Sequence, residues 1–136
     1  MEYKFTCNDR EYILNSNNCE GIFFENDDEI SGITLETILS ALNDGEEVSF
    51  TNEYYVGKCS CDTQEKIGKY YRFLEYHFYV YTKEHQYVIN TICKDYENTS
   101  FNKMLRAGKV DESYIVNVTV CPYCGTYSIE INQCEV

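Results

Sequence analysis

Hydrophobic and polar residues alternate over the first fourteen positions of the chain, with the period of two that is typical of β-strands. The alternation predicts a hairpin over residues 3–14, with its turn at residues 8–9, where Asn and Asp favour a tight turn. Short apolar runs predict further strands at residues 21–25, 48–50 and 54–56. The first part of the chain is therefore expected to contain several short strands.

Two segments follow a helical period instead. Over residues 35–42, apolar side chains recur at i, i+3, i+4 and i+7, which predicts an amphipathic helix. Ser31 or Thr34 can cap the start of this helix, and Gly45 can end it. A second, shorter helix is predicted over residues 100–107. The chain thus combines two helices with its strands.

The longest strands are predicted in the second half of the chain. The aromatic run at residues 70–82 is expected to be the central strand, and residues 87–93 return beside it after a turn. A last hairpin joins residues 114–120 to residues 127–131. Together these elements predict an α+β fold, a mostly antiparallel sheet of hairpins with two short helices, in a single domain over residues 1–136.

The start of the chain has neither the basic nor the apolar segment of a signal peptide, and no apolar run is long enough to cross a bilayer. We therefore expect a cytoplasmic protein with no membrane contact. Its eight cysteines are then expected to be thiols, because cytosolic reductants keep cysteine reduced. Metal binding becomes the leading use for closely spaced cysteine pairs.

Acidic residues are concentrated in one part of the chain. Residues 11–57 contain eleven acidic and no basic side chains, whereas the remainder has twelve acidic and eleven basic ones, for a formal net charge of −12. Such a field repels phosphate, so direct binding of nucleic acid is not expected. The acidic segment is either a solvated face that keeps the protein soluble or a docking surface for a basic protein partner.

The sequence Cys121-Pro122-Tyr123-Cys124-Gly125 lies at the tip of the last predicted hairpin and resembles the knuckle of zinc-ribbon proteins. Two thiolates separated by two residues can converge on one ion. Pro122 sets the turn, and Gly125 can adopt the positive φ that directs the following amides at sulfur. The motif predicts half of a zinc site.

The other half is expected from Cys59 and Cys61, which lie where a predicted strand passes into a turn. Zinc ribbons carry a CxxC on both sides, whereas this pair is CxC, so the identity of one ligand stays open. Cys134, Cys93 and His85 are the possible substitutes. Lysines at positions 58, 66 and 69 are close enough in sequence to offset the negative charge of a four-thiolate centre.

A closed four-cysteine site has no open position for a water molecule, so the predicted Zn²⁺ is structural rather than catalytic. A redox role for the CxxC pair is less favoured, because such motifs usually open a helix that lowers the pKa of the first thiol, and here a strand follows. The two histidines, His77 and His85, have no catalytic motif around them. No catalytic or cofactor-binding residue is predicted.

Four segments, at residues 21–25, 70–81, 94–103 and 121–128, together resemble an uncharacterised family of short proteins from clostridia-type bacteria. The resemblance covers the whole chain and implies a bacterial cytosolic setting. Because that family has no assigned activity, the resemblance implies no catalytic residue.

The leading hypothesis is a zinc-stabilised interaction or regulatory module, not an enzyme, that offers the acidic segment 11–57 to a basic partner. One alternative is a thiol, redox or metal-dependent enzyme that uses the CxxC motif. Another is an acidic mimic of nucleic acid that blocks a DNA-binding protein. The sequence leaves the partner and the oligomeric state open.

Overall fold

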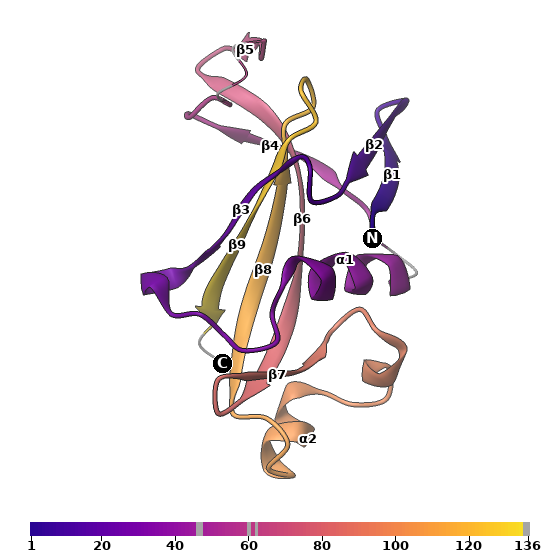
Figure 1. The fold of residues 1–136 in the computed structure, drawn as a ribbon, viewed down its shortest axis with the longest axis vertical. Helices are drawn as coiled ribbons and strands as arrows, with labels where there is room; N and C mark the ends of the chain where they lie inside the picture. Colours follow the sequence, from indigo (N-terminus) through magenta and orange to yellow (C-terminus); the bar gives the residue numbers. More distant parts are fainter. Residues whose placement is uncertain (46–47, 60, 62, 135–136) are drawn as a thin grey trace.

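The computed structural model describes residues 1–45, 48–59, 61 and 63–134 and shows the predicted α+β fold (Figure 1). The strands are β1 (Tyr3–Cys7), β2 (Arg10–Leu14), β3 (Cys19–Phe24), β4 (Thr51–Tyr55), β5 (Lys66–Ile67), β6 (Tyr70–Lys83), β7 (Gln86–Asn90), β8 (Glu112–Val120) and β9 (Tyr127–Cys134). The helices are α1 (Leu35–Asp44) and α2 (Phe101–Arg106), with the 3-10 turns η1 (Glu25–Asp27) and η2 (Lys94–Tyr96). Within these ranges, no helix is long and apolar enough to cross a membrane.

The main sheet has the strand order β3-β9-β8-β6-β4, and β5 and β7 pair with the two ends of the long strand β6. Its pairs are antiparallel, as predicted, except that β3 runs parallel to β9. Phe24 lies opposite Ile131 in this pair, more than a hundred positions later in the chain. A parallel pair of this kind is not predicted by hairpin reasoning, because no tight turn joins its strands.

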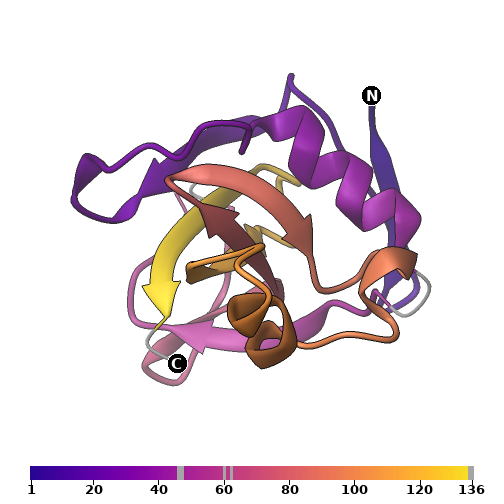
Figure 2. The ribbon, with the colours of Figure 1, turned by 90° about the horizontal axis from the view of Figure 1, so that it is seen from below.

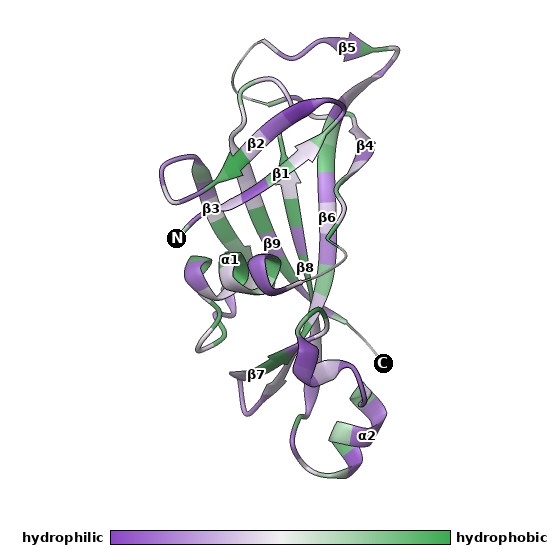
Figure 3. Ribbon diagram, turned by 90° about the vertical axis from the view of Figure 1, so that its right-hand side faces the viewer, coloured by the Kyte–Doolittle hydropathy of each residue, from purple (hydrophilic) through white to green (hydrophobic). Residues whose placement is uncertain are grey.

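Helix α1 lies along one side of the curved sheet (Figure 2), and alternate residues of β6, β8 and β9 face it. The side chains that are fully buried between the helix and the sheet are aliphatic. They include Ile38, Leu39, Leu42, Leu74, Val80, Val116, Val118, Val120, Ile129 and Ile131. The strand residues between them are more polar, which gives the alternating colours along β6, β8 and β9 in Figure 3. Burial of each large aliphatic side chain stabilises the fold by about 1.5–3 kcal/mol.

The ends of α1 show which of the two possible caps is used. The Thr34 hydroxyl accepts a hydrogen bond of 3.2 Å from the Thr37 amide, so Thr34 is the cap. Ser31 instead forms an isolated bridge with Gln86. At the other end, the Gly45 amide donates to the Ala41 carbonyl at 3.0 Å, and the helix ends there as predicted.

The hairpin β1-β2 forms a separate two-stranded sheet. Its turn residues Asn8 and Asp9 have φ of 52° and 65°, the left-handed pair that a two-residue hairpin turn requires. Phe5 stacks on the buried Phe50 with ring centroids 4.0 Å apart. This contact holds the hairpin against the main body, so that its turn lies beside the β8-β9 tip (Figure 1).

Several predicted strand limits are wrong, and the largest differences concern residues 48–56 and 87–93. Residues 48–50 are not a strand, and the predicted strand at 54–56 belongs instead to β4, which begins at Thr51 and ends at Tyr55. The strand predicted over 87–93 ends at Asn90, whose side-chain oxygen accepts from the Ile92 amide at 3.1 Å and turns the backbone out of the ladder. The second helix is confirmed, with Ser100 as its cap.

Candidate metal centre

The CPxCG segment occupies the turn between β8 and β9, directly after the buried end of β8. The Gly125 amide donates to the Cys121 carbonyl at 2.9 Å, and the Cys121 amide donates to the Thr126 carbonyl at 2.9 Å. Gly125 has a φ of 79°, as its place in the motif predicted. These bonds close the turn and direct both of its cysteines to one side.

Cys59 and Cys61 come to the same place from the segment that follows β4. The Cys59 backbone amide donates to the Gln64 side-chain oxygen at 2.8 Å. The Gln64 side-chain Nε2 in turn donates to the Arg72 backbone carbonyl at 2.7 Å. Gln64 thereby ties this segment to β6. Ser60 and Asp62 lie outside the described residues.

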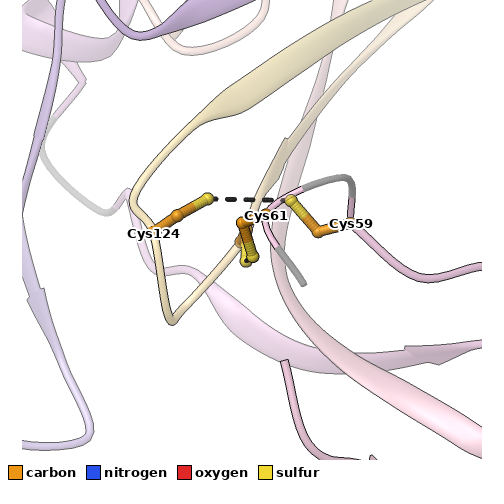
Figure 4. A group of neighbouring side chains, drawn as sticks. Cys59, Cys61 and Cys124 are labelled. Carbon is orange, nitrogen blue, oxygen red and sulfur yellow. Dashed lines mark hydrogen bonds between the residues drawn. The ribbon is translucent and has the colours of Figure 1, made fainter. Parts of the chain in front are cut away.

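The four sulfur atoms lie within 4.8 Å of one another. The Sγ atoms of Cys59 and Cys124 are 3.6 Å apart and point toward each other (Figure 4), and those of Cys61 and Cys121 are 3.8 Å apart. A tetrahedral zinc ion with Zn–S bonds of about 2.3 Å would hold its sulfurs about 3.8 Å apart. Disulfide sulfurs would be separated by about 2.05 Å, so all four residues are free thiols. The cluster could hold one metal ion.

The possible substitute ligands lie elsewhere. The Cys93 thiol donates to the Asn90 carbonyl at 3.3 Å, and His85 Nε2 lies 2.9 Å from an Asp28 carboxylate oxygen. Cys134 is the last residue of β9, at the end of that strand away from the knuckle. Among the described residues, the structure brings together the four cysteines that the motif spacing favoured and none of these three.

The environment makes these thiols chemically unequal. Burial raises the pKa of Cys121 to about 12 and also raises the pKa of Cys59. Hydrogen bonds from Thr63 lower the pKa of Cys61 to about 6. Buried thiols with raised pKa values remain protonated at neutral pH unless a cation replaces their protons. The site is therefore suited to a metal ion and poorly suited to four free thiolates.

Two threonine hydroxyls lie beside the exposed side of the cluster. Thr126 Oγ1 is 3.0 Å from Cys124 Sγ and 3.9 Å from Cys59 Sγ, and it also lies 3.3 Å from a Glu20 oxygen. Thr63 Oγ1 is 3.2 Å from Cys61 Sγ. The Thr63 hydroxyl can donate to metal-bound sulfur and orient it, whereas the Thr126 hydroxyl donates its proton to Glu20.

Sequence reasoning missed the cation that contacts the knuckle. Arg10, at the turn of β1-β2, donates to the Pro122 carbonyl and lies 3.4 Å from the Tyr123 carbonyl oxygen. The Tyr12 hydroxyl donates to the same Pro122 carbonyl at 3.2 Å, and the Arg10 guanidinium lies 5.1 Å from the Tyr12 ring centroid. The contact between Arg10 and Pro122 joins residues 112 positions apart, so no local sequence pattern predicts it. The role of the nearby lysines stays a prediction.

Asn18 is a second residue that the sequence did not single out. The side-chain Nδ2 of Asn18 donates to the Gly125 carbonyl at 3.0 Å and to the Ile13 carbonyl at 2.6 Å. The backbone carbonyl of Asn18 accepts a hydrogen bond from the Tyr127 amide at 3.0 Å. The loop between β2 and β3 therefore contacts and supports the knuckle. The four cysteines lie where three parts of the chain meet.

Comparison with known proteins shows the family of the chain. No curated protein and no solved structure matches the chain at a significant level. A family model described as "Protein of unknown function (DUF3785)" matches residues 3–136. Because this match spans nearly the whole chain, the protein belongs to the DUF3785 family, whose function is unknown.

Proposed function

We propose that the protein is a zinc-stabilised binding module rather than an enzyme, with one Zn²⁺ held by Cys59, Cys61, Cys121 and Cys124. The observation that carries the proposal is the set of four sulfur atoms within 4.8 Å of one another, at the spacing of a tetrahedral thiolate centre. The bacterial cytoplasm that the family resemblance implied belongs to the same proposal, since a reducing compartment keeps such thiols available.

Zinc is favoured over other ions by the donor set. Thiolates are soft ligands that select zinc, Cu(I) or iron–sulfur clusters, and a lone four-sulfur tetrahedron suits zinc. With all four positions taken by sulfur, the ion has no place for a reacting water molecule. The expected role of the ion is to fasten the segment after β4 to the tip of β8-β9.

The proposed partner is a basic protein, recognised through the acidic segment 11–57. All nine acidic side chains of that segment that the structure describes are exposed: Glu11, Glu20, Glu25, Asp27, Asp28, Glu29, Glu36, Asp44 and Glu53. Glu46 and Glu47 lie outside the described residues. An exposed field of one sign speeds encounter with a surface of the opposite sign and weakens as salt is added.

Metal analysis of the purified protein tests the zinc site. We expect one equivalent of zinc in the wild type and in C93S, whose thiol lies outside the cluster, and well under half an equivalent in C121S/C124S. Substitution with Co²⁺ should give the absorption of a tetrahedral thiolate centre. A wild-type protein that is folded and carries no zinc would contradict the site.

Affinity capture from a bacterial lysate at low and high salt tests the partner. A basic protein retained at low salt and released at high salt is the expected result. If the retained protein binds DNA and the two ligands compete, the module acts as a nucleic-acid mimic. Capture that does not change with salt would contradict an electrostatic docking surface.

A further inference from the structure

The face of the main sheet opposite α1 carries a cavity of about 320 Å³ beside the cysteine cluster. Strand register creates it: Glu75 on β6 lies opposite Thr119 on β8, and Glu130 on β9 lies opposite Asn117 on β8. All four side chains therefore share one face, and all four line the cavity. Tyr55 at the end of β4, with Gly57 and Lys58 after it, forms another wall.

Two aromatic rings and a fixed carboxylate make up one side of this cavity. Tyr55 and Phe73 meet edge to face with ring centroids 5.8 Å apart. The Tyr55 hydroxyl donates to a Glu75 oxygen, and Thr119 Oγ1 lies 3.5 Å from the same oxygen. The Glu75 carboxylate is thereby held in place, with its second oxygen outside these contacts.

The electrostatic character of the cavity is negative. Burial raises the pKa of Tyr55, and the charges of Glu75, Glu53 and Glu130 raise it further. Among the described residues that line the cavity, two carry carboxylates and one, Lys58, carries a positive charge, so their formal sum is −1. Aromatic faces combined with carboxylates are the surroundings in which ammonium and guanidinium groups are stabilised.

The volume limits what can enter. Pockets for small molecules are commonly about 300–1,000 Å³, so this cavity is at the small end of the range. It suits the end of a single side chain better than a cofactor. A planar guanidinium could pair with Glu130 and lie against the Tyr55 ring.

We propose that this cavity receives the guanidinium group of an arginine side chain presented by a partner protein, with Glu75 and Glu130 as its counter-charges and Tyr55 and Phe73 as its aromatic wall. The site supplies one defined anchor for the basic partner named above. It rests on the proposed function only for the nature of that partner. The zinc measurement tests neither the cavity nor its ligand.

An NMR titration with N-acetyl-arginine amide tests the proposal on the 136-residue chain as purified. We expect saturable shifts confined to the amides around the cavity, and none with N-acetyl-citrulline amide, the neutral isostere. E130Q should weaken binding about three-fold, because Glu130 is exposed on β9 and an exposed ion pair is worth under about 1 kcal/mol. K58Q should strengthen binding by a similar factor, since it removes a lining cation.

The matched control is E97Q, at the exposed residue that follows η2, which changes the net charge equally and should leave the affinity unchanged. Equal binding of citrulline and arginine, or equal effects of E130Q and E97Q, would overturn the proposal. Saturable binding of a free polyamine such as spermidine, with none of capped arginine, would also overturn it. If no protein is captured from the lysate but capped arginine binds specifically, the acidic docking surface is contradicted and the proposal for this cavity is supported.

Discussion

Removing the proposed zinc ion should lower the thermal stability by an amount set by the length of chain between the cysteines that it joins. The pairs Cys59–Cys124 and Cys61–Cys121 join positions 65 and 60 residues apart. An ion across them restrains a loop of that length in the unfolded chain. In the chain-entropy description of a cross-link, a loop of about 60 residues is worth about 4 kcal/mol at 25 °C. With an unfolding entropy of about 2.1 cal/mol/K per residue, this corresponds to a fall in Tm of about 14 °C.

This stabilisation of about 4 kcal/mol is smaller than the roughly 10–16 kcal/mol of folding free energy that zinc contributes to zinc-finger peptides. Those peptides have little core of their own, whereas here Leu74, Val116 and Ile129 are fully buried in an extensive apolar core. We therefore expect the metal-free protein to keep its sheet. Far-UV circular dichroism at 20 °C should change little while the melting curve moves down.

The assay compares the protein as purified with the protein after chelation, by calorimetry. The C124S variant removes one of the proposed ligands by mutation. Because Cys124 is exposed, serine at this position creates no cavity in the core. C93S is the matched control, since a serine hydroxyl can keep the bond that the Cys93 thiol makes with the Asn90 carbonyl. A chelated protein whose Tm falls by less than about 3 °C, under about 1 kcal/mol, would refute the cross-link reasoning.

Three further predictions concern single contacts. Arg10→Gln removes the hydrogen bond to the Pro122 carbonyl of the knuckle and should accelerate transfer of the ion to a competing chelator by about ten-fold. An unchanged transfer rate would contradict a supporting role for Arg10. In metal-free protein at pH 7, Cys61 should be alkylated first, because its pKa is lowered to about 6, and Thr63→Val should slow the reaction. Asp28 raises the pKa of His85, so Asp28→Asn should move the NMR titration of His85 down toward about 6.5. Stability from that pair should be present below the unfolded pKa and lost as the pH rises through the folded pKa of His85.

Local features of the fold were readable from the sequence because their causes lie within a few residues. The left-handed turn at Asn8 and Asp9, the Thr34 cap and the positive φ of Gly125 each follow from what those residue types permit. The cysteine cluster was readable for a related reason. The CxxC pair has the spacing of metal ligands, the CxC pair was placed beside it because both follow strands, and strand ends of one sheet come together at its edge.

Contacts between distant parts of the chain could not be read in this way. Arg10 on the Pro122 carbonyl and the parallel pairing of β3 with β9 each join segments more than a hundred positions apart, and neither leaves a periodic signal. The carboxylates of the cavity were hidden for the same reason. Glu75 and Glu130 look like ordinary solvent-facing strand residues until the register of three strands places them on one face.

The cysteine cluster and the cavity share one piece of chain, which leads to a last prediction. Tyr55 and Lys58 line the cavity, and Cys59, the next residue, is held at the cluster. Residues 54–58 are exposed, so few buried contacts hold this segment when the metal is removed. Chelation should therefore weaken the binding of capped arginine and broaden the amide signals of residues 55–59. The signals at Glu130, on a strand paired along its length with β8, should stay sharp, and chelated protein that binds arginine unchanged would show that the ion does not shape the cavity.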